Sequence, residues 1–388
     1  KKIIIDLNKK KKFWVISNIY FPNKTSTAHI LTKITESLDS DIITVLTSSK
    51  QKKNLILNSS IKVISIKQFF SKSNNLFLRL FDDFLFSLSV FVILIINLRV
   101  NDRIFSVTNP PLILPFLYLI KKLKKAKYIL LVHDVFPDNL ILLKGSNLIL
   151  EKVKKIYNKF YISPDIIIAI GNDMKNYISK SKKIPQHKIK VISNWFDNEI
   201  KKIPNNKYEK IKISYSGNIG RMQGFESLFE LIKKIKNKEN LIFDFYGTGP
   251  LHKNLINEVK INNLNFVNFH GSFKRESQLE ILKKTNIALV CLRKGMIGLG
   301  VPSKVYNLMA LGLPILYIGD KKSEIDNYIK EFDIGWSFNW SERNELLDFL
   351  ENIHNVNFKL IKIKGDNAHH LAIKKFSERL VLNKYKSI

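Results

Sequence analysis

Hydrophobic residues come in short, wholly apolar runs that are separated by longer segments with helical spacing. A first series of runs predicts strands at 13–17, 42–46, 61–66, 104–107, 128–132, 166–170 and 190–192. A second series predicts strands at 211–215, 241–246, 267–270, 287–292 and 315–318. Helices are predicted at 28–38, directly after 109–111, and at 226–236, 277–285, 303–311 and 366–385. Short apolar strands that alternate with helices are typical of βαβ units, in which helices cover both faces of a parallel sheet.

The two series are separated by a polar stretch at 197–210, which contains Pro204 and is predicted to be a linker. A chain of 388 residues is longer than one hydrophobic core usually serves. The fold class is therefore predicted as α/β, with two Rossmann-like domains at 1–200 and 201–365 that face each other across a cleft.

The charge balance is strongly basic, because 64 lysines and arginines stand against 33 acidic residues, a formal net charge of +31. Nucleic-acid binding would concentrate the basic residues on one element with aromatic side chains beside them. Attraction to an anionic membrane would place lysines beside apolar helices, as in the apolar segment 112–120 and the KKLKKAK that follows it. Because lysines run along the whole chain, general enrichment is favoured first and membrane attraction second.

The strongest apolar run is 84–98, bounded by Asp83 and Arg99. It is shorter than the roughly 20 residues that a spanning helix needs. We expect a helix that is buried or lies on a membrane surface, and a single span stays open. No signal peptide is predicted, and the one cysteine, Cys291, excludes an intramolecular disulfide, so a cytoplasmic location is expected.

The first candidate site is the turn YSGNIGRMQG, which follows a predicted strand and precedes a helix. Gly217 and Gly220 allow a tight turn and close approach to a ligand, and the N–H groups at a helix start favour an anion. Arg221 adds a planar, permanently charged group suited to phosphate oxygens. The glycines alone could also be purely geometric.

The second candidate is the segment GLGVPSKVYNLMALGLP at 298–314. Pro302 suits the entry to a helix, Ser303 suits a cap, and Lys304 lies in the first turn. A cation in the first turn opposes the helix dipole unless an anion is bound there. We therefore predict a phosphate contact for Lys304.

The third candidate is HDVFPD, at the end of a predicted buried strand, where ligands bind in open α/β sheets. His133 could bind a sugar hydroxyl or move a proton, although a histidine beside Asp134 could equally be structural. No metal site is predicted, because the only DxD, at 39–41, precedes a strand and is interpreted as a turn. Arg221 and Lys304 could instead stabilise a departing diphosphate.

Taken in order, SGNIGRMQG, YGTGP, FHGSFKRE, the GVPSK-helix unit and the final FSERL resemble the C-terminal domain of glycosyltransferase family 4. SNIYFP, VTNPP and VHDVFPD resemble its WbuB-type subgroup, which builds O-antigen and capsule sugars. The resemblance covers nearly the whole chain. It implies the GT-B fold, with a C-terminal helix at 366–388 that packs back towards the first domain, and sugar transfer with retention of configuration, without a metal ion or other cofactor.

The resemblance also implies roles for individual residues. His133, Arg221 and Lys304 would be catalytic, and Asp134 and Asp138 would lie on the acceptor side. The donor would be held by Gly217, Asn218, Gly220, Arg221, Ser272, Phe273, Lys274, Pro302, Ser303, Lys304 and Asn307. The chain departs from the family's Glu-x7-Glu pattern, because Leu299 and Asn307 occupy the glutamate positions. An asparagine can hydrogen-bond a ribose hydroxyl but brings no charge.

The partners implied are a nucleotide-sugar donor, such as a UDP-linked N-acetylated deoxysugar, and a polyprenyl-diphosphate-linked acceptor at the inner face of an anionic membrane. Two rival functions stay open. A sugar-nucleotide epimerase of the same fold would need acidic residues around the sugar. A basic membrane-binding or nucleic-acid-binding protein without enzymatic activity is the other, although no nucleic-acid motif is present and no nucleic-acid partner is expected.

Overall fold

The computed structural model describes residues 12–23, 25–40, 42–50, 60–70, 73, 75–204, 209–273 and 277–388. The chain divides into two compact units. Unit 1 contains the described residues up to Ile170, Lys175–Ile192 and Leu382–Ile388, and unit 2 contains Gly171–Met174 and Ser193–Val381.

Unit 1 is built on a parallel sheet of seven strands in the order β3-β2-β1-β4-β5-β6-β7. Its strands are β1 (Lys12–Ile16), β2 (Ile42–Thr47), β3 (Ile61–Ser65), β4 (Arg103–Val107), β5 (Lys127–Val132), β6 (Ile166–Ala169) and β7 (Ile189–Val191). Its helices are α1 (Ser26–Ser37), α2 (Leu76–Asn97), α3 (Ile113–Lys124), α4 (Asp138–Lys144), α5 (Leu148–Ile162) and α6 (Asn172–Lys182), of which α6 begins in unit 2.

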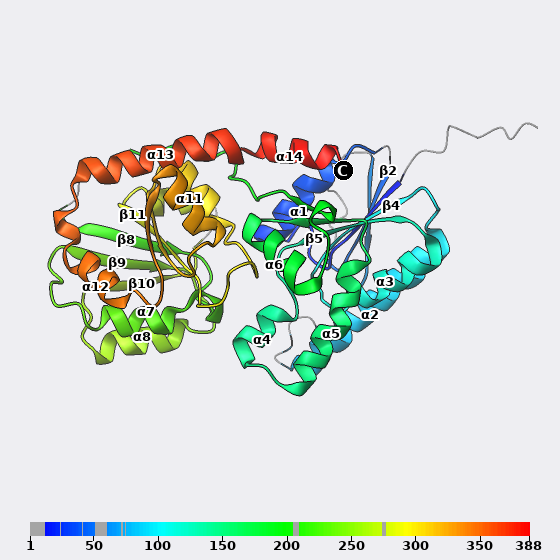
Figure 1. Ribbon diagram of the computed structural model, residues 1–388, viewed down its shortest axis with the longest axis horizontal. Coiled ribbons are helices and arrows are strands. Elements are labelled where there is room, and N and C mark those ends of the chain that lie inside the picture. Colours follow the sequence, from blue (N-terminus) through cyan, green and yellow to red (C-terminus); the bar gives the residue numbers. More distant parts are fainter. Residues whose placement is uncertain are drawn as a thin grey trace, which may run out of the picture. The chain divides into compact units, whose positions relative to one another are not determined.

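Unit 2 is built on a parallel sheet of six strands in the order β10-β9-β8-β11-β12-β13. Its strands are β8 (Ile211–Ser216), β9 (Leu241–Tyr246), β10 (Val267–Gly271), β11 (Ile287–Cys291), β12 (Ile315–Ile318) and β13 (Gly335–Phe338). Its helices are α7 (Phe225–Ile232), α8 (His252–Ile261), α9 (Gln278–Leu282), α10 (Lys304–Ala310), α11 (Glu324–Phe332), α12 (Arg343–Glu351), α13 (Phe358–Phe376) and the start of α14 (Glu378–Lys386). In Figure 1, α7 and α8 lie on one side of this sheet and α11 and α13 on the other.

Each sheet reverses its strand order once. In unit 1 the chain winds outward from β1 to β3 and then resumes at β4, beside β1. In unit 2 it winds outward from β8 to β10 and resumes at β11, beside β8. The loops that leave the two central strands of such a sheet diverge to opposite sides, and the crevice between them is where ligands bind in this class of fold. The order of strands therefore points to the loops after β8 and β11.

The predicted strands are confirmed to within a residue or two, because apolar runs such as those of β5 and β11 are buried on both faces. The strand β13 was not predicted, since its four residues, GWSF, include no aliphatic side chain. The predicted helix at 226–236 ends earlier, at Ile232, and the helix at 277–285 is only Gln278–Leu282.

The single C-terminal helix predicted at 366–385 is wrong, because two helices occupy this region and the first starts eight residues earlier. Ser377 has an extended backbone between α13 and α14. The carbonyl of Phe376 accepts a hydrogen bond from the N–H of Phe196 (3.1 Å), and Phe196 forms a parallel bridge with Ser377. These backbone bonds replace those that would continue the helix. Beyond the break, Tyr385 is buried in unit 1 against Phe105.

Candidate functional site

The turn after β8 is shaped by backbone packed on backbone. Gly217 has φ +141°, and its N–H donates to the carbonyl of Tyr246 (2.8 Å). The neighbouring turn after β9 supports it, because a Cβ on Gly247 would lie 1.8 Å from the carbonyl oxygen of Gly217. Only glycine can stand at position 247. The YGTGP motif therefore holds the first glycine turn in place.

Lys304 lies against this turn. A Cβ on Gly217 would be 3.7 Å from both Cδ and Nζ of Lys304. The ammonium nitrogen lies 3.2 Å from the centre of the Tyr215 ring, and the Tyr215 hydroxyl donates to the carbonyl of Asn218 (2.7 Å). Lys304 follows β11 and Gly217 follows β8, so Lys304 and the predicted glycine turn meet where the strand order of unit 2 reverses.

The ammonium group of Lys304 is enclosed and has no hydrogen-bond partner among the described residues. Burial lowers its pKa to about 7, and the nearby thiol of Cys291 offsets this only in part. The face of an aromatic ring attracts a cation but does not replace a counter-charge. An anion bound beside Nζ would restore the ordinary protonation of this lysine.

Arg221 begins a 3₁₀ turn, Arg221–Gln223, and is exposed. Among the described residues its guanidinium forms no hydrogen bond or ion pair that would hold it elsewhere. The turn itself is fixed, because the N–H of Gly220 donates to the Gln223 side chain (3.1 Å). Arg221 is thus a free, permanently charged group on the same loop as Gly217.

Ser303 is the N-cap residue of α10, but its side chain makes no capping hydrogen bond. The predicted capping role of its hydroxyl is therefore wrong, since the backbone at Ser303 is already helical and does not aim the hydroxyl at the following N–H groups. The carbonyl of Pro302 accepts from the N–H of Val305 (3.2 Å), so the proline precedes the helix as expected.

Asn307 is engaged within unit 2. Its amide donates to a carboxylate oxygen of Asp197 (3.1 Å), and its carbonyl oxygen accepts from the backbone N–H of Asp197 (3.1 Å). This pair ties the segment after Ser193 to α10, and further along Ile203 is buried in unit 2. Within the predicted linker, Asp197 and Ile203 are thus held on unit 2, whereas most residues between them are exposed. The ribose contact of Asn307 stays a prediction.

The segment after β10 was predicted to lie near the base. Phe273 stands edge-on to Tyr246, with ring centres 6.4 Å apart, and Ser272 is exposed. Lys274 lies outside the described residues. Next to this segment, the rings of Tyr246 and His270 are stacked, with ring centres 4.3 Å apart and an angle of 12° between their planes. This stack was not predicted from the sequence.

A pair of buried carboxylates in unit 2 was also missed. Asp173 accepts from the N–H groups of Glu324 (3.1 Å) and Gly298 (3.4 Å). Glu324 in turn accepts from the Asn172 backbone (2.7 Å) and the Tyr328 hydroxyl (2.7 Å). Burial, followed by the charge of Glu324, raises the pKa of Asp173 to about 6. Through Gly298 the pair anchors the loop that leads to Lys304.

The third candidate motif follows β5 in unit 1. His133 is half-buried, its Nε2 is enclosed without a hydrogen-bond partner among the described residues, and burial lowers its pKa to about 4. It is therefore neutral at physiological pH. Asp134 is exposed. Both residues follow the carboxyl end of β5, which lies one strand away from the place where the strand order of unit 1 reverses, between β1 and β4.

Asp138 has a different setting. Its carboxylate binds the hydroxyl of Tyr177 (2.6 Å) and the ammonium groups of Lys154 (3.0 Å) and Lys182. Burial would raise the pKa of Asp138, but the hydrogen bonds from Lys182 and Tyr177 hold it below its ordinary value. These contacts occupy the carboxylate with partners inside unit 1, as expected for a residue that stabilises the fold. The acceptor-side role of Asp138 stays a prediction that its contacts do not favour.

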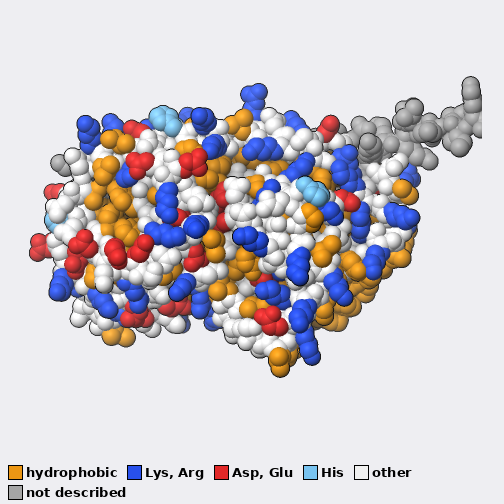
Figure 2. Space-filling view, in the orientation of Figure 1, with side chains coloured by type: hydrophobic (Ala, Val, Ile, Leu, Met, Phe, Trp, Pro, Cys, Tyr) orange, Lys and Arg blue, Asp and Glu red, His pale blue; other side chains and the backbone are white. Residues whose placement is uncertain are grey.

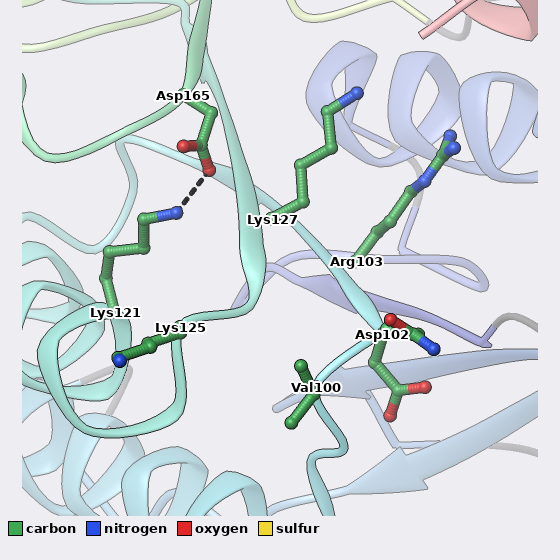
Figure 3. A pocket seen from close by; sticks show the side chains of 8 residues that line it. Val100, Asp102, Arg103, Lys121, Lys125, Lys127 and Asp165 are labelled. Carbon is green, nitrogen blue, oxygen red and sulfur yellow. Dashed lines mark hydrogen bonds and ion pairs between the residues drawn. The ribbon is translucent and has the colours of Figure 1, made fainter. Parts of the chain in front are cut away.

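A shallow hollow of about 420 Å³ lies at the other end of the unit 1 sheet, where β4 and β5 begin. Figure 3 shows Lys121 directed at Asp165, whereas Arg103 and Lys127 point together away from Lys125. The cations of this hollow do not converge on one point. Within the described residues, no group of three or more His, Cys, Asp or Glu side chains could hold a metal ion.

Residues 196–354, which contain the glycine turn, Lys304 and their supporting loops, match the family model Glycosyl transferases group 1. This part of the chain is thus similar to group 1 glycosyltransferase domains. A probable glycosyltransferase of Pseudomonas aeruginosa, WbjE, is 33% identical over 67% of the chain and 66% of its own length. A putative colanic acid biosynthesis glycosyl transferase of Escherichia coli, WcaI, is 26% identical over 60% of each protein. The chain thus spans about two thirds or less of these relatives.

Solved structures give the fold of the whole chain. HepE of Anabaena, in complex with UDP, is 13% identical, covers 97% of this chain and 98% of its own, and has a TM-score of 0.70. The two parallel-sheet units are those of the GT-B fold, as predicted. HepE has also been solved with UDP-glucose, at a TM-score of 0.71.

Proposed function

We propose that this chain is a glycosyltransferase that moves a sugar from a UDP-linked donor to a lipid-linked saccharide during polysaccharide synthesis. The observation that carries the proposal is the enclosed ammonium group of Lys304, held over Tyr215 and against Gly217 without a counter-charge. A diphosphate supplies the missing negative charge. The UDP and UDP-glucose complexes of HepE support this donor. The similarity to the probable glycosyltransferase WbjE and to WcaI, a putative colanic acid biosynthesis glycosyl transferase, supports sugar transfer in polysaccharide synthesis.

The finer proposal follows the WbuB-type resemblance. The donor sugar is an N-acetylated deoxysugar, and the acceptor is a saccharide on polyprenyl diphosphate at the cytoplasmic face of the membrane. Gly217 and Asn218 line the diphosphate, and Ser272 and Phe273 lie beside the base. His133, neutral because burial lowers its pKa to about 4, hydrogen-bonds a hydroxyl of the transferred sugar.

The reaction proposed is front-face transfer with retention of configuration. The acceptor oxygen forms a bond to the anomeric carbon as the bond from that carbon to the UDP phosphate oxygen breaks. The acceptor proton passes to that phosphate oxygen, so no side-chain base is needed. Arg221 and Lys304 stabilise the charge that develops on the diphosphate, the role that a metal ion has in other transferases.

A screen of nucleotide sugars for thermal stabilisation of the protein tests the donor class. UDP and one or more UDP-sugars should raise the melting temperature, whereas the matched CDP and GDP compounds should not. Stabilisation by none of the UDP compounds would overturn the proposal.

The stabilising donor is then incubated with and without a polyprenyl-diphosphate-linked saccharide. Sugar transfer should require the acceptor and should continue in EDTA. Conversion of the donor without any acceptor would instead identify an epimerase.

A further inference from the structure

One side of α2 is apolar and exposed. Its large side chains at spacings of three and four residues lie along one side of the helix, and we call them the apolar face: Phe77, Phe81, Phe84, Leu88, Val92 and Ile96. Phe77 is 81% exposed and Ile96 73%, so the face is open at both ends. Figure 2 shows hydrophobic side chains gathered along the edge of unit 1 that α2 forms in Figure 1. A continuous patch of this kind marks an interaction surface.

The opposite side of α2 is built into unit 1. Phe86, Val90 and Leu94 are almost completely buried. On the flank of α2 that packs along α3, Phe84, at the border of the apolar face, and Phe91 both contact Phe116. The buried carboxylate of Asp82 accepts hydrogen bonds from the backbone of Phe69 and Phe70. These contacts attach the helix to the unit from Asp82 to Leu94.

The helix has 22 residues, and an 18-residue stretch of it has a mean hydropathy of 2.0. It is the one described helix that is long and apolar enough to cross a membrane. The apolar run 84–98 therefore gave too short a length for this helix, because α2 starts at Leu76 and includes the charged residues Arg79 and Asp83. Crossing a bilayer would pull α2 off α3 and expose the contacts of Asp82 to lipid. A helix with one buried side and one exposed apolar side instead fits a position parallel to the membrane surface.

The end of α3 brings positive charge beside this face. Lys122, Lys124 and Lys125 lie there without acidic partners among the described residues, and we call them the cationic rim. Leu119 and Leu123, 44% and 63% exposed, belong to the same part of α3. The apolar face continues past Ile96 to Val100, which is 73% exposed and borders the hollow that Lys125 also lines. Apolar and cationic surface are thus contiguous, the complement of an anionic bilayer.

We propose that unit 1 docks on an anionic bilayer through α2, with the apolar face among the upper acyl chains and the cationic rim at the lipid phosphates. Lysines near such a surface are attracted to the lipid phosphates, and large apolar side chains favour the bound state because they leave water. The two contributions together give a stable but reversible attachment. This docking does not depend on the sugar-transfer activity.

Flotation with phosphatidylcholine vesicles, with and without phosphatidylglycerol, tests the proposal on the whole chain. The wild type should float with the anionic vesicles and should be released by carbonate. Replacing Phe77, Phe81 and Val92 by glutamate should weaken binding at least about tenfold, since three large apolar contacts are lost. The matched control replaces Ile261, Leu360 and Ile373, exposed on unit 2, by glutamate and should bind like the wild type.

A second variant replaces Lys122, Lys124 and Lys125 by glutamine. Its binding to anionic vesicles should fall to the level that the wild type shows on phosphatidylcholine alone. Thermal unfolding of all variants checks the fold, because the altered side chains are surface ones.

Several outcomes would overturn the proposal: no flotation of the wild type, undiminished flotation of the glutamate variant of α2, or resistance to carbonate, which would indicate a spanning helix. A wild type that is a dimer by light scattering, and that the α2 variant makes monomeric, would show that a second copy covers the apolar face.

Discussion

The two units each bury a lysine over a tyrosine ring, with opposite consequences. In unit 1, Lys182 lies 5.4 Å from the ring centre of Tyr161 and donates to the carboxylate of Asp138. In unit 2, Lys304 lies 3.2 Å from the ring centre of Tyr215 and has no such partner among the described residues. Burial lowers the pKa of both lysines, and that of Lys304 reaches about 7. The ammonium group of Lys182 is part of an internal hydrogen-bond network, whereas that of Lys304 lacks a hydrogen-bond partner among the described residues.

The presence or absence of an acidic partner distinguishes a buried lysine that stabilises the fold from one that is available to bind an anion. A buried ion pair such as Lys182–Asp138 satisfies itself, and removing either member leaves an uncompensated charge. A buried cation without a partner lowers the stability of the fold, and its protonated state is favoured only when an anion arrives. The same residue type over the same ring is therefore part of the core in unit 1 and, under the proposed function, part of a diphosphate site in unit 2.

The largest expected effect is on catalysis. Lys304→Met should reduce sugar transfer by about 10²–10³-fold, because a preorganised charge at the leaving group contributes on this scale. Its thermal stability should equal or exceed that of the wild type, since a buried, unpartnered amine is replaced by an apolar side chain of similar length. The control is Lys253→Met, an exposed lysine of α8, which should transfer at the normal rate. Near-normal sugar transfer by Lys304→Met would show that Lys304 does not stabilise the leaving diphosphate.

The reverse pattern is expected in unit 1. Lys182→Met should destabilise the protein by about 3 kcal/mol in urea unfolding, because Asp138 keeps its buried charge with only Lys154 and Tyr177 as partners. Adding Asp138→Asn should recover part of the loss. UDP affinity of the folded variant should be unchanged. If Lys182→Met is as stable as the wild type, the contrast between paired and unpaired lysines does not hold.

The pH dependence of UDP binding reports on Lys304 directly. The pKa of Lys304 is about 7 in the free protein, so its ammonium form predominates below pH 7, is half populated at the pKa and is lost as the pH rises further. Affinity should fall by up to about tenfold per pH unit above 7, because binding must then take up a proton. Lys304→Arg keeps its charge and meets the same ionisation of UDP, so the ratio of the two affinities, measured by calorimetry, isolates the lysine. A flat ratio from pH 6 to 9 would contradict this pKa.

Stability without ligand should change in the opposite sense. An unfolded lysine holds its proton up to its ordinary pKa of 10.5, whereas folded Lys304 releases it near 7. The unfolded state therefore binds more protons between these values, and the contribution of Lys304 to folding becomes more favourable as the pH rises through this window. Lys304→Met should lack that part of the pH dependence, which paired urea titrations at pH 7 and 9 can measure.

The fold was predictable because fully apolar strands such as IALVC and ILYI fit only a sheet covered on both sides. The break at Ser377 was not, since it depends on a backbone bridge to Phe196, far away in the sequence. At the site, an anion contact was predicted from the glycine spacing and from the position of Lys304, whose positive charge lies in the first turn of a helix and opposes the helix dipole. The sequence could not show that Tyr215 would enclose the ammonium group, or that Asn307 would be engaged by Asp197, because both depend on tertiary packing.

Tyr215 offers the smallest and most discriminating change. Tyr215→Phe keeps the ring under Lys304 and loses only the hydrogen bond to Asn218, so stability should fall by about 1 kcal/mol while the pH profile of UDP binding stays in place. Tyr215→Leu removes the ring, whose attraction for a cation amounts to about 1–2 kcal/mol in a desolvated site. The neutral amine is then favoured further, and the midpoint of the profile should move below 7 by about one pH unit. An equal shift in both variants would mean that the hydroxyl, and not the ring, sets the protonation of Lys304.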